Sequence, residues 1–249
     1  MKRALRARGL KLAQYARAKL LDMALLLRFG LSEVTIGGKP AVRVPYKDSA
    51  GKECAVRFRL RMKGKRFRWQ TGDHLCLYGL WRTQQMRGAG YVVLVEGESD
   101  VHTLWSQNFP ALGLPGANSW REPWAAHLAG IPKIYVVIEP DKGGEAVLKG
   151  FARSTIRNRV RIVRLNGAKD PSELYLKDPR HFKKNFRAAL QAALPWSELQ
   201  QPEEEDDADA NDSTGRNSQA SQLIAIADSA HFFRSNDDKP YAVIPVNGH

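Results

Sequence analysis

The chain has 249 residues, with 39 Lys and Arg against 26 Asp and Glu, and a formal net charge of +13. This length allows one or two compact domains with appendages, and it excludes a small stapled scaffold and a wholly disordered chain. Two cysteines, Cys54 and Cys76, are too few for a zinc module or a disulfide framework. No apolar run approaches the ~18–20 residues of a membrane span. We therefore expect a soluble protein without a membrane partner, in a reducing, cytoplasmic setting.

Charge is distributed unevenly along the chain. Residues 1–90 carry a net charge of +16, from 21 basic and 5 acidic side chains, whereas residues 196–249 carry −8, from 3 basic and 11 acidic side chains. The acidic stretch that begins after Trp196 has almost nothing to bury, which predicts a disordered linker over residues 197–221. Beyond it, 223–233 has helical apolar spacing, and 241–245 is predicted to be a strand without a partner.

The first ninety residues show two kinds of hydrophobic periodicity. Apolar side chains recur at helical spacing over Arg17–Phe29, and Gly30 follows in the position of a C-cap. Over 42–44 and 56–63, apolar and cationic residues alternate. This alternation predicts strands with one packed face and one wet, cationic face, with Phe58 on the packed face. Turn residues between the two strands predict a hairpin.

From Gly90 onwards the pattern changes to alternating strands and helices. Apolar runs typical of buried strands, the third of them more mixed, lie at Tyr91–Val95, Ile134–Ile138 and Val160–Leu165. The helices are predicted at 99–108, 122–129 and 145–157. This alternation predicts a mainly parallel sheet with helices on both faces.

Acidic residues follow each of the three predicted strands, over 96–100, 139–145 and 169–173. In an open parallel sheet, ligands bind at the carboxyl ends of the strands. Carboxylates that converge there repel one another unless a cation compensates their charge, and oxygen ligands suit Mg²⁺ or Mn²⁺ rather than zinc. Magnesium takes one or two protein carboxylates together with substrate phosphates, so the pattern favours a phosphoryl-transfer site.

Other residues in the same loops fit this interpretation. Gly97, Gly143 and Gly144 would let the backbone approach a phosphate or a metal, and Lys142 and Lys169 would add positive charge for phosphate oxygens. A purely structural interpretation is also open, because Asp141 is a common turn residue and Ser99 a common helix N-cap.

These residues resemble the Toprim domain, the metal-dependent module of bacterial-type primases, type IA and II topoisomerases and some nucleases. The Glu-Gly pair that follows the first strand in that family matches Glu96-Gly97. Its Asp-x-Asp loop matches Glu139-Pro140-Asp141, with Glu in place of the first Asp, so Glu139 is a less secure metal ligand than Asp141. The match covers about 90 residues.

The flanking residues resemble one branch of the family. Leu77–Leu80 is similar to the segment that enters the Toprim domain of bacterial-type primases, and 44–59 is similar to their basic N-terminal subdomain. The stretch 169–174 is similar to their acidic loop. From about Tyr15 to Trp196 the chain resembles the primase part of phage-type or plasmid-type primase–helicases.

The resemblance implies a role for each acid. Glu96 would be the catalytic acid/base or a carboxylate that organises the metal, and Asp141 would share the catalytic site. Divalent Mg²⁺ or Mn²⁺ would be arranged by Glu96, Glu139, Asp141, Asp100 and Asp170. The implied reaction is attack of a ribonucleotide 3′-hydroxyl on the α-phosphate of an incoming NTP, directed by a single-stranded DNA template. One metal would activate the attacking oxygen and another would stabilise pyrophosphate.

A cationic segment in the N-terminal part is the candidate template-binding surface. Cations on a strand face can track phosphates, whereas the neighbouring aromatic residues alternate with the cations and are expected to pack inward. The candidate residues are Arg57, Arg59, Arg61, Lys63, Lys65, Arg66 and Arg68.

The predicted organisation is a basic primase-like subdomain over 1–89, a Toprim catalytic domain over 90–196, the linker over 197–221, and the start of a further, truncated domain over 222–249. A DNA primase working with a replicative helicase, in cis or in trans, is the favoured hypothesis. A Toprim nuclease and a non-catalytic module that binds single-stranded DNA or loads a helicase stay open. Bacterial primases usually carry a zinc module, so it is either supplied elsewhere or the sequence is a fragment.

Overall fold

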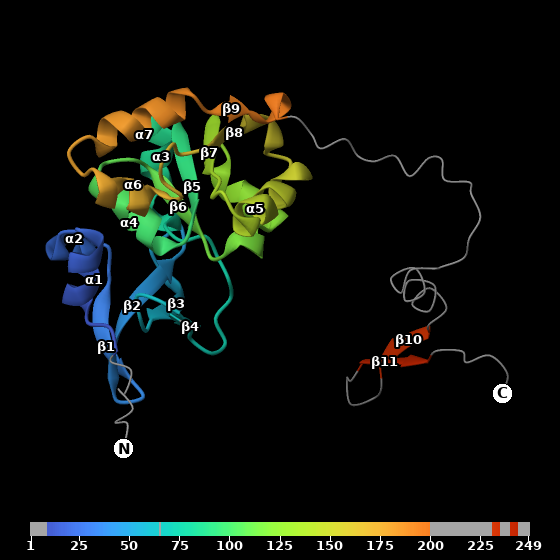
Figure 1. Ribbon diagram of the computed structural model, residues 1–249. Coiled ribbons are helices and arrows are strands. Elements are labelled where there is room, and N and C mark those ends of the chain that lie inside the picture. Colours follow the sequence, from blue (N-terminus) through green and yellow to red (C-terminus); the bar gives the residue numbers. More distant parts are fainter. Residues whose placement is uncertain (1–8, 65, 200–230, 235–239, 244–249) are drawn as a thin grey trace, which may run out of the picture. The chain divides into compact units, whose positions relative to one another are not determined.

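The computed structural model describes residues 9–64, 66–199, 231–234 and 240–243. The described residues up to Leu199 form one compact unit, and the short strands beyond residue 230 belong to a second unit. Within the first unit a four-stranded antiparallel sheet precedes a five-stranded, mainly parallel sheet with helices (Figure 1). This arrangement confirms the α/β fold that the sequence predicts, with a small α+β part in front of the parallel sheet. Among the described residues, no helix is long and apolar enough to cross a bilayer.

The segment predicted as one helix over Arg17–Phe29 contains two. Helix α1 spans Leu12–Lys19 and α2 spans Met23–Arg28. The prediction was wrong because Leu20 adopts a left-handed conformation, with φ 51°, and ends α1. Asp22 then begins α2 as its N-cap and accepts a hydrogen bond from the Ala24 N–H.

Gly30 closes the second helix as the sequence predicts. It has φ +89°, and its N–H donates to the Leu27 carbonyl, while the next N–H, of Leu31, donates to the Leu26 carbonyl. This pair of bonds is a Schellman motif, which satisfies carbonyl groups at the helix end.

The N-terminal sheet has the strand order β1-β2-β3-β4. Its strands are β1 (Ser32–Ile36), β2 (Lys39–Lys47), β3 (Glu53–Arg59) and β4 (Phe67–Trp69). The predicted hairpin joins β2 to β3, and the Asp48 carboxylate accepts hydrogen bonds from the N–H groups of Ala50 and Lys52. The side chain of a turn residue therefore fixes the register of the two long strands.

The central sheet has the order β6-β5-β7-β8-β9, and only the short edge strand β9 runs antiparallel to its neighbour among the described strands. The strands are β5 (Tyr91–Glu96), β6 (Ala111–Leu114), β7 (Lys133–Val137), β8 (Val160–Val163) and β9 (Leu194–Pro195). The three predicted strands are confirmed as β5, β7 and β8. Strand β6 was not predicted, because Gly113 interrupts its apolar residues and prolines flank it on both sides.

Helices cover both faces of the central sheet. The α-helices are α3 (Thr83–Ala89), α4 (Glu98–Ser106), α5 (Lys142–Ala152), α6 (Pro171–Lys177) and α7 (Phe182–Gln191). The 3₁₀ helices are η1 (Leu80–Arg82), η2 (Ala117–Ser119), η3 (Glu122–Leu128), η4 (Arg157–Arg159) and η5 (Trp196–Glu198). The helix predicted near 122–129 is the 3₁₀ helix η3, and α3, α6 and α7 were not predicted.

Two apolar clusters lie on opposite faces of this sheet. Val93, Val95 and Val137 pack with α4 and α7, and Leu94 and Val136 pack with η3 and α5. Figure 1 shows α4 and α7 on one side of the sheet and α5 on the other. Because side chains alternate along each strand, the continuous apolar runs of β5 and β7 supply both clusters.

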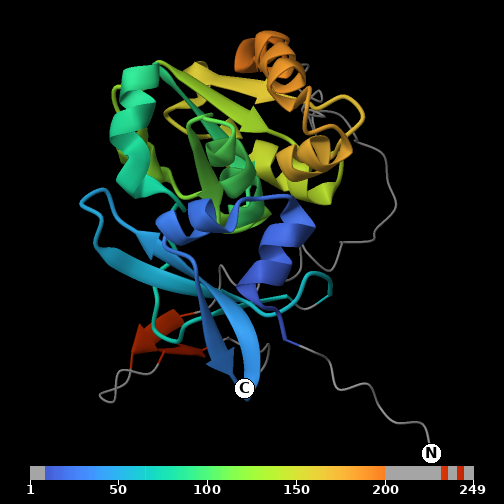
Figure 2. The ribbon, with the colours of Figure 1, turned by 90° about the vertical axis from the view of Figure 1, so that its left-hand side faces the viewer.

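The N-terminal sheet shares a core with one of these faces. Tyr15 of α1, Leu26 of α2 and Val42 of β2 belong to the same cluster of buried residues as Val93. Figure 2 shows α1 and α2 between the N-terminal sheet and the helices of the central sheet. The apolar cluster therefore fixes the basic N-terminal part against the parallel sheet.

The second unit contains the hairpin of β10 (His231–Arg234) and β11 (Pro240–Val243). The strand predicted over 241–245 therefore has a partner, and the helix predicted over 223–233 is wrong for its last three residues. Residues 223–230 and 244–245 lie outside the described part, as does the predicted linker 197–221 beyond Leu199. The first residues of that stretch, up to Glu198, belong to η5.

Candidate active site

The carboxyl ends of β5, β7 and β8 lie at one edge of the central sheet. These strands are parallel neighbours, with Leu94 opposite Val136 and Val136 opposite Ile162. The acids that follow each strand therefore start from the same edge, as the sequence predicts. The structure shows which of them meet.

Glu96 is the last residue of β5 and is half-buried. Gly97 turns the chain into α4 with φ +93°, a conformation that favours glycine. Oxygen Oε1 of Glu96 is buried, and none of the residues that the structure describes forms a hydrogen bond with it. Burial, with the charges of Glu139 and Asp141, raises the pKa of the Glu96 carboxyl to about 7. Glu96 thus has a buried carboxylate oxygen whose hydrogen-bonding capacity is not used by the described residues.

Asp141 lies beside Glu96 because of Gly143. Asp141 is the N-cap of α5, and its Oδ1 accepts hydrogen bonds from the N–H groups of Gly143, at 2.8 Å, and Gly144, at 3.2 Å. A Cβ atom at Gly143 would lie 2.9 Å from Asp141 Oδ1 and 3.2 Å from Glu96 Oε2. A side chain at residue 143 would crowd both carboxylates, so their oxygen atoms lie near one another only because this residue is glycine.

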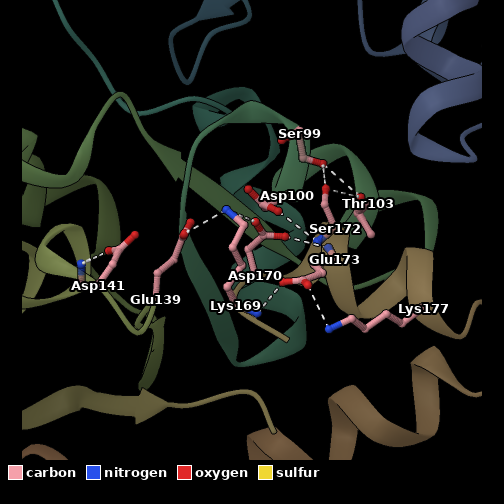
Figure 3. A network of polar contacts seen from close by, with 11 residues as sticks. Ser99, Asp100, Thr103, Glu139, Asp141, Lys169, Asp170, Ser172, Glu173 and Lys177 are labelled. Atoms are coloured by element: carbon pink, nitrogen blue, oxygen red, sulfur yellow. Dashed lines mark hydrogen bonds and ion pairs between the residues drawn. The ribbon is translucent and has the colours of Figure 1, made fainter. Parts of the chain in front are cut away.

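Lys169 joins Glu139 to Asp170 (Figure 3). Its Nζ lies 3.4 Å from Glu139 Oε2 and 3.0 Å from Asp170 Oδ2. The hydrogen bond with Asp170 raises the pKa of Lys169 above its ordinary range, so the side chain is cationic at neutral pH. Asp170 also begins α6 as its N-cap and accepts a hydrogen bond from the Glu173 N–H at 2.7 Å. The Lys169 ammonium group therefore compensates the charge of these two carboxylates in the structure.

Asp100 lies in the first turn of α4, buried behind this group. Its Oδ1 accepts a hydrogen bond from the Ser172 N–H at 3.0 Å, and the Ser172 hydroxyl lies 3.1 Å from that of Thr103 (Figure 3). Burial, with the charge of Asp170, raises the pKa of Asp100 to about 7. The structure places Asp100 as a link between α4 and α6.

The remaining residues predicted to contact phosphate differ in position. A Cβ at Gly144 would lie 2.0 Å from the Glu139 carbonyl oxygen, so this glycine allows close backbone packing. Lys142 is exposed at the first position of α5, beside Asp141. Gly97 has open space where a Cβ would lie.

The carboxylates of Glu96 and Asp141 fit a divalent cation whose remaining ligands come from the substrate. No three His, Cys, Asp or Glu side chains in the described ranges are placed to hold a metal by themselves. Glu96 and Asp141 nevertheless offer oxygen atoms near one another, one of them buried without a hydrogen-bond partner among the described residues. Mg²⁺ needs only one or two carboxylates when phosphates and water complete its shell.

The prediction that the cations of β3 lie on a solvent-exposed face is partly wrong. Arg59 is buried, with 4% exposure, and its guanidinium lies over the Tyr15 ring. Arg57 is 14% exposed in its side chain and lies over Phe67 and Trp69. These arginines lie on the same face of the sheet as Phe67 and Trp69, and this face is turned towards the core. The alternation was assigned to the wrong faces because Phe58 is only half-buried, on the opposite face beside Arg43 and Arg68.

The other predicted template contacts are accessible. The exposed members are Arg61, Lys63, Arg66 and Arg68. Lys65 lies outside the described residues. The cationic surface therefore consists of the end of β3, β4 and the connection between them.

Sequence reasoning missed a buried polar group next to Glu96. The Glu98 carboxylate accepts hydrogen bonds from Arg57 Nη1 at 3.0 Å and from the Tyr46 hydroxyl at 2.5 Å. Glu98 is only 3% exposed. Its place two residues after Glu96 was visible in the sequence, but its partners are 41 and 52 positions away, and no local spacing predicts them.

The fold is that of primase catalytic cores. It matches the E. coli primase catalytic core with a TM-score of 0.58 and 18% identity, covering 74% of each chain. It matches the RNA polymerase domain of Mycobacterium tuberculosis primase DnaG with a TM-score of 0.59 and 17% identity, covering 74% of this chain and 76% of the other.

A third match belongs to the assembly of bacteriophage T7 lagging-strand DNA polymerase with primase domains of gp4 bound to an RNA/DNA hybrid. Its TM-score is 0.57 at 23% identity, covering 72% of this chain and 91% of that one. No protein-family model matches the sequence, and no curated protein matches it. The protein therefore has a primase-like architecture, with an acidic cluster at the edge of its parallel sheet.

Proposed function

We propose that the protein is a primase-type nucleotidyltransferase that makes short RNA primers on single-stranded DNA with Mg²⁺ or Mn²⁺. The observation that carries the proposal is the proximity of the Glu96 and Asp141 carboxylates to one another beside Gly143. The primase-like fold supports it, and one similar structure is a DnaG primase catalytic domain bound to single-stranded DNA.

In the proposed reaction, the 3′-hydroxyl oxygen of the growing strand forms a bond to the α-phosphorus of an NTP. The bond from that phosphorus to the bridging oxygen breaks, pyrophosphate leaves, and the hydroxyl proton is released. Glu96, with its buried Oε1, is placed either to accept this proton or to bind metal.

The chain's own residues would arrange the reactants. Glu96 and Asp141 would hold the divalent ion, which when bound offsets the charge that develops on the transferred phosphate and on pyrophosphate. Lys169 keeps Glu139 and Asp170 together and adds a cation at the same edge. Because Gly143 has no side chain, the carboxylates of Glu96 and Asp141 would both stay available beside it.

The template would lie along the exposed cations of the N-terminal part. Arg61, Lys63, Arg66 and Arg68 offer charge for DNA phosphates. A replicative helicase, in cis or in trans, is the proposed partner, because primer synthesis needs an unwound strand.

Primer synthesis by the parent and by Glu96→Gln tests the proposal. The full chain is incubated with single-stranded templates, labelled NTPs and Mg²⁺ or Mn²⁺. We expect short RNA from the parent, a loss of roughly 100-fold or more in Glu96→Gln, and little change in DNA affinity. Glu198→Gln, at an exposed glutamate of η5, is the matched control and should keep parental activity.

Two other products would overturn the assignment. Cleavage of the template that depends on Glu96 would make the protein a Toprim nuclease. Binding of single-stranded DNA by the parent without RNA synthesis or cleavage would make it a non-catalytic module.

A further inference from the structure

The only two cysteines of the chain lie side by side. Cys54 is in β3 and Cys76 follows β4 by seven residues, and both are free thiols. Their sulfur atoms are 2.9 Å apart, and the Cys54 thiol also lies 3.5 Å from the Tyr46 carbonyl oxygen. Residues 22 positions apart in the sequence are thus in contact in the fold.

Structured backbone on both sides holds the sulfur atoms in place. Beside Cys54, the Val56 N–H donates to the Asp73 carboxylate at 2.6 Å, and the Val56 carbonyl accepts from the Gln70 N–H at 3.0 Å. Beside Cys76, Leu77 and Tyr78 are fully buried. The contact therefore follows from the packing of β3 against the segment that enters the central sheet.

The two thiols differ in access to solvent. Cys54 is exposed, whereas Cys76 is partly covered. Burial, with the hydrogen bond to Cys54, raises the pKa of the Cys76 thiol. A small reagent therefore reaches Cys54 first, with Cys76 next to the sulfur that has reacted.

We propose that Cys54 and Cys76 form a reversible intramolecular disulfide by exchange with a low-molecular-weight disulfide such as oxidised glutathione. The Cys54 thiolate attacks one sulfur of the reagent, forms a mixed disulfide and releases one thiolate. Cys76 then loses its proton and attacks Cys54 Sγ, which forms the protein disulfide and releases the second thiolate. The protein loses two electrons and two protons, and the reagent gains them.

The disulfide between Cys54 and Cys76 would enclose the cationic segment. All seven cations of the predicted template-binding segment, from Arg57 to Arg68, lie between the two cysteines. The disulfide closes a covalent loop that contains β4 and the exposed cations Arg61, Lys63, Arg66 and Arg68. Closing a loop restricts the unfolded chain and holds the two ends of the segment together. The redox state of the surroundings would then decide whether the two ends of this segment are covalently joined.

The test is chemical and does not depend on primer synthesis. The full chain is equilibrated with oxidised and reduced glutathione at graded ratios under native conditions, and free thiols and intact mass are measured. We expect the titratable thiols to fall from two to none, the mass to fall by that of two hydrogen atoms, and dithiothreitol to reverse both changes. A peptide joining Cys54 to Cys76 should appear in a non-reducing digest.

Two variants serve as controls. Cys76→Ser should stop at the mixed disulfide and gain the mass of one glutathione at Cys54, and Cys54→Ser should react much more slowly. The oxidised parent should unfold at a temperature higher by roughly 5–10 °C, and neither variant should show this shift.

Three results would overturn the proposal: two titratable thiols after equilibration with excess oxidised glutathione, a stable mixed disulfide on the parent, or disulfides only between two chains. Failure of primer synthesis would leave these measurements unchanged, so the two proposals can fail separately.

Discussion

At the scale of single residues, His102 is a buried histidine that the proposed chemistry does not use. It is 1% exposed, and its ring nitrogens lie 2.8 Å from the hydroxyls of Tyr15 and Tyr78. A neutral imidazole can accept from one tyrosine and donate to the other. Burial, with the charges of Arg59 and Lys19, lowers the pKa of His102 to about 3.

This shift predicts a loss of stability in acid. Below the unfolded pKa of about 6.5, the unfolded state binds a proton that the folded state excludes. The free energy of unfolding should therefore fall by about 1.4 kcal/mol per pH unit between about pH 6 and pH 4 because of His102. It should be unaffected by this group above pH 7.

The measurement is urea unfolding of the parent and His102→Gln at several pH values. Burial raises the pKa values of Glu96 and Asp100 to about 7, so these carboxyls change stability in the opposite direction. Their contribution is common to both proteins, and the difference between the two curves isolates His102. Parallel curves between pH 6 and pH 4 would show that its pKa is not lowered.

At the scale of elements, the break between α1 and α2 depends on one strained residue. Leu20 has φ 51° and is half exposed, and its N–H donates to the Arg17 carbonyl at the helix end. Left-handed backbone costs a residue with a Cβ roughly 1 kcal/mol more than glycine.

We expect Leu20→Gly to stabilise the protein by roughly 0.5–1 kcal/mol, measured by chemical denaturation. The matched control is Leu27→Gly. Leu27 is exposed to a similar extent, 53% against 50%, but lies inside α2, where glycine should cost roughly 1 kcal/mol. Equal destabilisation by both changes would contradict the strain at Leu20.

Sequence periodicity predicted some of these elements and missed others. The buried strands β5 and β7 were predictable because both faces of each strand are apolar. The position of the acids at the strand ends was predictable because the composition changes there from apolar to acidic. The break between α1 and α2 at Leu20 was not predictable, because no glycine stands at that position to indicate the end of a helix.

The faces of β3 were predicted wrongly for a related reason. Arginines that alternate with aromatic residues in a strand are expected to face solvent. Arg57 and Arg59 instead place their guanidinium groups over aromatic rings inside the fold. The close approach of Asp141 to Glu96 depends on a glycine two residues after Asp141. The spacing of the acids in the sequence predicts that they lie at the same edge of the sheet. Which acidic side chains lie close together depends on the packing.

At the scale of the whole molecule, a buried ion pair connects the two sheets. Arg57 of β3 donates to Glu98 of α4, and Tyr46 of β2 donates to the same carboxylate oxygen. Glu98 is two residues after Glu96, so the pair links the N-terminal sheet to the loop that carries the candidate catalytic residue. Breaking a buried pair costs more than breaking an exposed one, because the remaining charge stays without a partner.

A double-mutant cycle with Arg57→Met and Glu98→Gln measures this link. We expect a coupling energy of about 2 kcal/mol in the free energy of unfolding, because both side chains are largely withdrawn from water. The control is the ion pair of Arg43 and Glu53, which joins β2 to β3 and is exposed by 28% and 40%. The cycle of Arg43→Met and Glu53→Gln should give less than about 1 kcal/mol.

DNA binding in the same variants separates two roles for Arg57. If it acts inside the fold, Arg57→Met keeps the parental salt dependence of binding to single-stranded DNA, whereas Arg68→Met, at an exposed position of β4, lowers the slope. A reduced slope for Arg57→Met together with a coupling energy near zero would place Arg57 on the template instead. The two sheets would then be joined by their shared apolar core, without help from this ion pair.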